Sequence, residues 1–231
     1  MTSTLQVALV GADGAGKSTI TQMLERGPVP FPVKRVYMGV NLEASSLMLP
    51  TTRLLLAVKR VRGRRPDLVA GSDPVATTER SSPGNRLARS AKDSARLGVW
   101  VLEEWLRQLV AAGYGRRGYV VVFDRHFFAD YYHSDIAPAT DRRAGARVHG
   151  WLLQHVYPKP DLVVCLDAPG DVLFARKGEA SAAWLEQRRQ QYLALGAVVP
   201  AFAVVDADRP LPSVFADVVA AIEARRKVAA P

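Results

Sequence analysis

A glycine-rich stretch near the start of the chain carries the residues with the most specific chemistry. Residues 11–19 read Gly-Ala-Asp-Gly-Ala-Gly-Lys-Ser-Thr and fit the phosphate-binding pattern G-x-x-x-x-G-K-[ST]. In such a P-loop, glycines let backbone N–H groups surround a phosphate, the lysine reaches the β- and γ-phosphates, and the serine hydroxyl ligates Mg²⁺. The expected nucleotide-binding residues are Gly11, Asp13, Gly14, Ala15, Gly16, Lys17, Ser18 and Thr19.

The stretch also lies in the local context that this motif requires. Residues 5–10, Leu-Gln-Val-Ala-Leu-Val, form a short apolar run that suits a buried parallel strand. Residues 18–25 have helical composition, with Ile20, Met23 and Leu24 able to share one face. Strand, glycine-rich turn and helix together predict a nucleotide site, with the helix N-terminus adding donors for the phosphates.

A second motif supplies an acidic residue at the end of a buried strand. Residues 119–124 read Tyr-Val-Val-Val-Phe-Asp, the clearest strand in the sequence. A carboxylate in this position matches the Walker B arrangement, in which an aspartate lies near the Mg²⁺ bound by the P-loop. We therefore expect Ser18 and Asp124 to be the metal-binding residues, with ATP and Mg²⁺ as cofactors.

The remaining elements must place these motifs side by side. Apolar runs separated by helical stretches predict a three-layer α/β fold, with a five-stranded parallel sheet covered by helices on both faces. The expected strands are 5–10, 33–40, 119–124, 162–166 and 201–205. The expected helices are 18–25, 51–62, 86–112 as one long helix or two, 144–156, 176–195, and a last helix that starts at Leu211 or Ser213 and ends at Ala229. In the third of these helices, we expect Leu97, Val101, Leu102, Trp105, Leu106 and Leu109 to face inward.

Length and composition limit the class of protein. The 231 residues are expected to form one domain, with residues 63–85 as a mobile basic loop. The formal net charge is +9, but no helix-turn-helix, zinc-finger or RNA-binding signature accompanies it, which favours a small-molecule partner over nucleic acid. A signal segment and a membrane-spanning stretch are both missing from the sequence pattern, so we expect a cytoplasmic protein.

Several motifs together resemble the thymidylate kinase family. They are the P-loop, Phe-Asp-Arg-His at 123–126, Pro-Asp-Leu-Val-Val-Cys-Leu-Asp at 160–167, and Arg-Lys-Gly-Glu at 176–179 followed by Gln-Arg-Arg-Gln-Gln-Tyr-Leu at 187–193. The resemblance covers most of the chain and thins between residues 33 and 97. It implies a P-loop kinase with ATP as donor, and a homodimer.

The resemblance also implies roles for individual residues. Asp124 would support Mg²⁺, Arg125 would bind the acceptor phosphate, and Asp13 would contact the acceptor sugar hydroxyl. Residues 176–192 would form the lid and the helix after it. The family arginine found inside some P-loops is replaced here by glycine, so the lid residues Arg176 and Lys177 become the candidates for the catalytic positive charge.

The acceptor stays open at this point, because the family motifs that bind thymidine are altered. Thymidylate kinases carry Arg-Glu-Pro-Gly after the second strand, whereas residues 38–42 here read Met-Gly-Val-Asn-Leu. We expect transfer of the γ-phosphate of ATP to a nucleoside monophosphate or to another small phosphorylated or sugar acceptor. The alternative is a P-loop regulatory ATPase or nucleotide switch that acts on a protein or nucleic-acid partner, motivated by the basic residues of 63–85.

Overall fold

A computed structural model describes the protein at residues 5–39, 49, 83–132, 144–178 and 180–229. Within this part, side chains are described from residue 97 onward in the helix that starts at Pro83, and from residue 147 onward in the helix that starts at Ala144. The expected helix at 51–62 and most of the basic stretch 63–85 lie outside the described residues.

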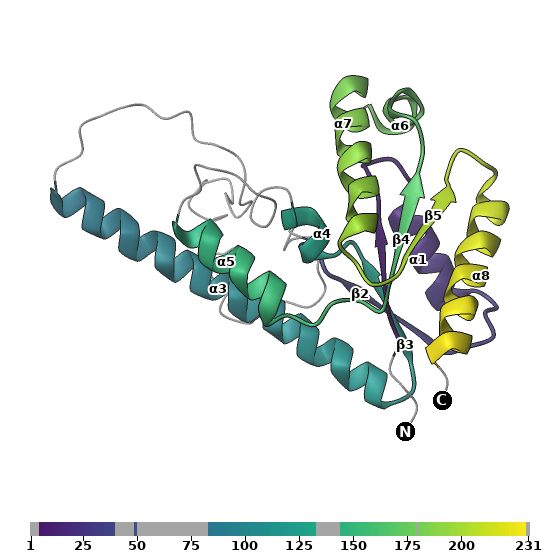
Figure 1. Ribbon diagram of the computed structural model, residues 1–231, viewed down its shortest axis with the longest axis horizontal. Coiled ribbons are helices and arrows are strands. Elements are labelled where there is room, and N and C mark those ends of the chain that lie inside the picture. Colours follow the sequence, from purple (N-terminus) through teal and green to yellow (C-terminus); the bar gives the residue numbers. More distant parts are fainter. Residues whose placement is uncertain (1–4, 40–48, 50–82, 133–143, 179, 230–231) are drawn as a thin grey trace, which may run out of the picture.

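Five short strands form one parallel sheet (Figure 1). They are β1 (Gln6–Val10), β2 (Val33–Tyr37), β3 (Val120–Asp124), β4 (Leu162–Asp167) and β5 (Phe202–Asp206). Their order in the sheet is β2-β3-β1-β4-β5. The three central strands are almost completely buried, which explains why they are continuous apolar runs rather than alternating ones. The predicted fold class is confirmed.

Helices cover both faces of the sheet, and the direction of each crossover decides which face. The helices are α1 (Lys17–Arg26), α3 (Pro83–Arg116), α4 (Phe127–Tyr131), α5 (Ala144–His155), α6 (Gly170–Lys177), α7 (Ala182–Leu193) and α8 (Leu211–Ala229). The connection from β1 to β2 runs toward one edge of the sheet, whereas the later connections run back toward the other edge. Right-handed crossovers therefore place α1 on the face opposite to α3, α5 and α7, and α8 packs beside α1.

Two helical predictions were wrong in detail. The stretch expected to be one helix over 176–195 is divided, because Gly178 ends α6 in a left-handed conformation (φ 66°) and the Ser181 side chain caps α7 by accepting the N–H of Trp184. The basic stretch was expected to remain a loop to residue 85, but α3 begins at Pro83, a residue that is well suited to the first turn of a helix.

The predicted inward face of α3 was wrong at two of its six positions, since Leu97, Val101, Trp105 and Leu106 are half-buried. Leu102 and Leu109, expected to face inward, are 61% and 63% exposed. The buried side of the helix instead carries mostly polar side chains: Trp100, Glu103, Glu104, Arg107, Gln108 and Ala111. The polar stripe has the same helical spacing as the leucine stripe, so the periodicity of the sequence does not reveal which stripe faces the protein.

Large apolar side chains remain at the surface of two neighbouring helices. α3 and α5 pack against each other (Figure 1). Leu102 and Leu109 on α3, Val148 and Trp151 on α5, and Val156 just after α5 are exposed, and we call these five residues the α3–α5 apolar face. A group of exposed apolar side chains of this kind marks a surface that suits contact with another protein molecule. No helix among the described residues is long and apolar enough to cross a membrane.

Candidate functional site

The predicted P-loop connects β1 to α1 as a turn built on glycine conformations. Gly11, Gly14 and Gly16 all have positive φ, at 140°, 91° and 86°. A β-carbon on Gly11 would lie 2.5 Å from the Leu166 carbonyl oxygen of β4, so no larger residue fits there without a backbone shift. The turn thus presents backbone N–H groups at the start of α1, the end of a helix that favours anions. This cradle fits the phosphates of a nucleotide.

Lys17 is buried directly beneath this turn. Its ammonium donates to the carbonyl oxygens of Gly11 and Ala12, each at 2.8 Å, and lies 4.0 Å from an Asp13 carboxylate oxygen. Burial, followed by the charge of Arg125, lowers the pKa of Lys17 to about 8. A lysine held by two neutral carbonyls and one carboxylate retains affinity for a further anion, as binding a phosphate requires.

Ser18 and Asp124 meet at the edge of the sheet where β1 and β3 end. The register pairs Leu9 with Asp124, and the parallel strands therefore bring Asp124 next to the start of α1. The Ser18 hydroxyl donates to an Asp124 carboxylate oxygen at 3.2 Å. The hydroxyl and the carboxylate lie at hydrogen-bond distance from each other, and both are oxygen ligands of the type that Mg²⁺ prefers.

The pair does not amount to a complete metal cage. Among the described residues, no group of three or more His, Cys, Asp or Glu side chains is placed to hold a metal ion. A nucleotide-bound Mg²⁺ takes one or two protein ligands and completes its shell with phosphates and water, so it needs no more from the protein than the Ser18 hydroxyl and the Asp124 carboxylate. The residues present fit the expected cofactor on these grounds.

Arg125 and Asp13 form an ion pair across the P-loop. A guanidinium Nη2 of Arg125 donates to an Asp13 carboxylate oxygen at 2.5 Å. Burial opposes ionisation of Asp13, but Arg125 and Lys17 together hold its pKa below the ordinary value. Arg125 itself has a left-handed backbone (φ 66°), which is uncommon for a residue other than glycine. Backbone strain of this kind is concentrated at functional sites.

Arg35 is a charged neighbour of Asp124 that the sequence did not single out as a site residue. Its guanidinium Nη1 lies 3.5 Å from the second carboxylate oxygen of Asp124, and its Nε lies 3.8 Å from Glu25 on α1. Both carboxylate oxygens of Asp124 are thus engaged, one by Ser18 and the other by Arg35. The available signal was the charged pair Lys34 and Arg35 inside a strand that is otherwise Val, Val and Tyr.

Asp130 is a second charged residue that the sequence did not place in the site. It lies on α4, a short helix that begins where the His126 side chain accepts the N–H of Phe128. Asp130 accepts a hydrogen bond from the Tyr192 hydroxyl of α7 at 2.9 Å, and its charge acts on both Arg125 and Lys17. Burial raises the pKa of Asp130 and lowers that of His126 to about 3, so this histidine is a neutral cap.

The two lid candidates, Arg176 and Lys177, point to different parts of the protein. Arg176 donates to the Ala207 carbonyl at 2.9 Å and pairs with Asp208 at 3.3 Å, which ties the end of α6 to the loop after β5. The charge of Lys177 acts on Asp13 and helps to lower the pKa of that carboxyl group. Of the two, Lys177 is therefore the one whose charge reaches the P-loop.

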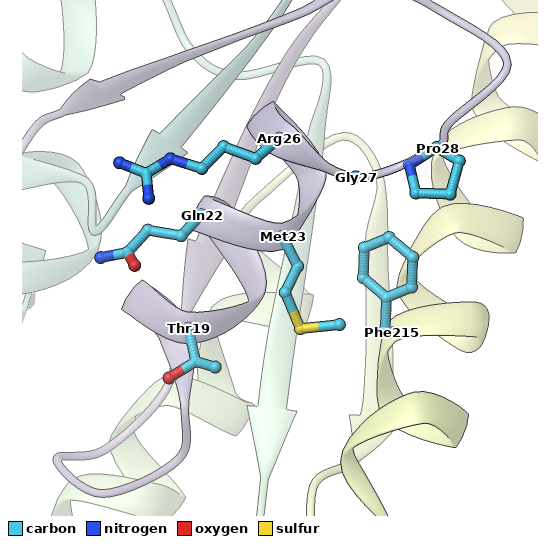
Figure 2. A pocket seen from close by; sticks show the side chains of 7 residues that line it. All are labelled: Thr19, Gln22, Met23, Arg26, Gly27, Pro28 and Phe215. Atoms are coloured by element: carbon cyan, nitrogen blue, oxygen red, sulfur yellow. The ribbon is translucent and has the colours of Figure 1, made fainter.

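A groove on the flank of α1 lies apart from this chemistry. Figure 2 shows it between α1 and α8, where the Met23 and Phe215 side chains point toward one another. Its volume is about 360 Å³, and it is lined by Thr19, Gln22, Met23, Arg26, Gly27, Pro28 and Phe215. Of the predicted nucleotide-binding residues, Thr19 alone is among those that line the groove. The groove contains no acidic residue and no other P-loop residue, so we assign it no part in the site.

The sheet with its phosphate-binding loop between β1 and α1 defines the P-loop NTPase fold. Among solved structures, the chain is similar to deoxyadenosine kinase from M. mycoides with products dCMP and a flexible dCDP bound. The two share 14% sequence identity with a TM-score of 0.50, over 95% of this chain and 100% of the other. No protein-family model and no curated protein matches the sequence. At this identity the similarity shows the fold, and the activity must be argued from the residues.

Proposed function

We propose that the protein is an ATP- and Mg²⁺-dependent kinase of the thymidylate kinase-like group. It would transfer the γ-phosphate of ATP to a nucleoside monophosphate or to another small phosphorylated or sugar acceptor. The observation that carries the proposal is the Asp13–Arg125 ion pair beside Lys17. A P-loop that only hydrolyses ATP needs a phosphate cradle and a metal site, whereas a kinase also needs a cation that holds the acceptor.

The chain's residues divide the work of phosphoryl transfer in the following way. Lys17 would exchange its carbonyl partners for phosphate oxygens of ATP, and Ser18 and Asp124 would hold Mg²⁺. The bound Mg²⁺ would neutralise charge on the phosphates. Arg125 holds the acceptor phosphate, and Asp13 accepts a hydrogen bond from the acceptor sugar. Such a reaction depends on positioning and charge neutralisation more than on covalent chemistry by the protein.

We assign the lid function to the α6–α7 region, with separate roles for its two cations. Lys177 supplies positive charge at the P-loop, where charge develops during transfer. Arg176 anchors α6 to the loop after β5 through Ala207 and Asp208. Arg189 supports this arrangement because its guanidinium makes two bonds, of 2.6 and 2.9 Å, to the Asp167 carboxylate at the end of β4.

The proposal is tested by measuring ADP release from Mg-ATP with a panel of nucleosides, nucleoside monophosphates and sugar phosphates. We expect one class of acceptor to stimulate ADP release, and Lys17→Ala to abolish it. Arg125→Met should lower kcat/KM for the acceptor by about 100-fold and leave KM for ATP unchanged, because the lost cation faces the acceptor. Arg125→Lys should recover part of the loss.

ATP hydrolysis that no acceptor stimulates would refute the kinase proposal. That result would favour the alternative, a regulatory ATPase or nucleotide switch. The basic stretch that motivates this alternative lies almost entirely outside the described residues. Its test is whether RNA, DNA or a protein partner remains bound through purification, and whether deleting residues 63–82 releases it.

A further inference from the structure

α3 places a buried arginine next to the acceptor side of the proposed kinase site. Arg107 is only 1% exposed, and its Nη1 donates to the Gly39 carbonyl, just after β2, at 3.0 Å. Gly39 also touches the proposed acceptor-phosphate residue, since a β-carbon there would lie 2.8 Å from Cδ of Arg125. A single backbone residue thus separates the two arginines. A ligand whose phosphate lies at Arg125 has its remaining atoms within reach of this region.

Two of the three guanidinium nitrogens of Arg107, Nε and Nη2, have no hydrogen-bond partner among the described residues. Both nitrogens are buried. These two atoms form the side edge of the guanidinium, whose parallel N–H groups bind two adjacent acceptors in one plane. A buried donor without a partner is costly and rare in folded proteins, and this one carries a charge as well. The two N–H groups on the side edge of Arg107 are therefore suited to donate to two coplanar acceptors of a ligand.

An unfilled acceptor lies one helical turn before Arg107. Glu103 is completely buried, and one of its carboxylate oxygens accepts the Leu49 N–H at 2.9 Å. Its other oxygen, Oε2, is buried and has no partner among the described residues. Helix geometry puts residues four apart on the same face, and the charge of Glu103 acts on Arg107. Two free donors and one free acceptor are therefore neighbours on α3.

The surroundings favour a flat, uncharged ligand over an anion. Glu103 and Glu104 both act electrostatically on Arg107, and two buried carboxylates repel a phosphate or carboxylate. Trp100 and Tyr131 pack edge to face, with ring centroids 6.3 Å apart, and Tyr131 is itself close enough to act on Arg107. Aromatic side chains beside polar groups are typical of sites for flat heterocycles, including nucleobases.

From this juxtaposition we infer that Arg107 and Glu103 read the base of the acceptor, and that the base is cytosine or guanine. The side edge of Arg107 and Oε2 of Glu103 together fit an edge that reads acceptor, acceptor, donor. Cytosine offers this order as O2, N3 and the N4 amino group, and guanine offers it as N7, O6 and N1–H. Thymine, uracil and adenine instead read acceptor, donor, acceptor and leave one N–H of Arg107 facing a donor. The inference rests on the proposed kinase function and names its acceptor class.

Equilibrium binding tests the inference without any phosphate transfer. Isothermal titration calorimetry on the full chain with MgADP present would compare nucleosides and nucleoside monophosphates of cytosine, guanine, adenine, thymine and uracil. We expect cytosine or guanine ligands to bind about 5- to 150-fold more tightly than the others, the range given by one bidentate contact. The cytosine and guanine arms identify which of the two bases it is.

Single-atom changes in the ligand and matched variants sharpen the test. A ligand with uracil in place of cytosine, or with 7-deazaguanine in place of guanine, should bind about 5- to 150-fold more weakly. The Arg107→Met variant should bind the preferred ligand more weakly by the same factor, and its affinity for MgADP should stay unchanged. Arg116→Met is the control, since it makes the same change at an exposed position of the same helix. Glu103→Gln should also weaken the preferred ligand, because an amide presents a donor or a weaker acceptor there.

Three results would overturn the inference. They are equal affinity for all bases, no binding of any nucleoside or nucleotide, and unchanged affinity in a folded Arg107→Met protein. If that variant does not fold, the ligand series on the unaltered protein decides by itself. Base-selective binding without ADP release would refute the proposed kinase function and keep the inference. ADP release that acceptors with every base stimulate equally would support the kinase function and overturn the inference.

Discussion

The lowered pKa of Lys17 predicts that nucleotide affinity falls at moderately alkaline pH. In the proposed kinase the charged ammonium of Lys17 binds the phosphates, but burial and Arg125 favour the neutral amine in the free protein. The carboxylates of Asp13, Asp130 and Asp124 oppose this shift and leave the pKa at about 8. An ordinary lysine, with a pKa near 10.5, would stay charged throughout the range in which the protein can be handled.

The magnitude follows from the population of charged Lys17. With a pKa of about 8, the free protein carries the charge in about 90% of molecules at pH 7 and in about 10% at pH 9. Apparent affinity scales with the population that is competent to bind, so Kd for MgADP should rise about tenfold between these pH values. Bound phosphates keep the lysine charged in the complex, and the whole change therefore belongs to the free protein.

Calorimetric titration of MgADP at half-unit steps from pH 6.5 to 9.5 measures this profile. Lys17→Arg is the control, because a guanidinium stays charged at every pH in the range and should give a flat profile at its own affinity. A flat profile to pH 9 in the unaltered protein would refute the reasoning. It would mean that the carboxylates around Lys17 outweigh its burial.

The same shift has a consequence for stability with the opposite trend. Lys17 has a lower pKa in the folded protein than in the unfolded chain, so its buried charge costs stability below pH 8. That cost disappears as the pH rises from 8 toward 10.5, because the folded protein has by then released the proton. Relative to Lys17→Met, the unliganded protein should gain stability over this interval in denaturant titrations.

Further predictions concern the lid, the P-loop and the surface. Lys177→Met should lower kcat by about 100-fold, because its charge acts at the P-loop. Arg176→Met should mainly raise KM for ATP, by about tenfold, because Arg176 anchors α6 to the loop after β5. Equal kinetic effects of the two changes would contradict these separate roles. Gly11→Ala should lower Tm by about 5–10 °C, because its β-carbon meets a carbonyl of β4. Gly16→Ala, with nothing within 4 Å of its β-carbon, should lower Tm less, and similar losses would rule out the clash. We expect a second copy to cover the α3–α5 apolar face, so that light scattering finds a dimer that Trp151→Glu converts to a monomer; a monomeric parent protein would refute this.

Local patterns were sufficient to predict the sheet and the phosphate-binding turn. A P-loop is one contiguous segment, and its glycines, lysine and serine have fixed positions relative to one another whatever the rest of the chain does. Buried parallel strands are likewise visible as apolar runs. The break between α6 and α7 had a visible signal as well, since Gly178 and Ser181 are a helix end and a helix cap in the sequence.

The polar side of the candidate site could not be predicted in this way. On α3 a leucine stripe and a charged stripe have the same helical period, and the choice of buried stripe depends on what packs against the helix. Burying Glu103 and Arg107 is favourable only if a ligand or backbone partner completes their hydrogen bonds, and those partners come from β2 and beyond. Helical spacing contains no information about them.

The sequence by itself determined the fold class and the position of the glycine-rich turn between β1 and α1, because both depend on short-range spacing and on apolar strand composition. Only the tertiary structure decided which charges meet. The parallel register of β1 and β3 brings Asp124 to Ser18, and it also brings Arg125, the next residue, to Asp13. Coulomb and hydrogen-bond interactions act over a few ångströms in space between residues more than a hundred positions apart, and folding alone creates that proximity.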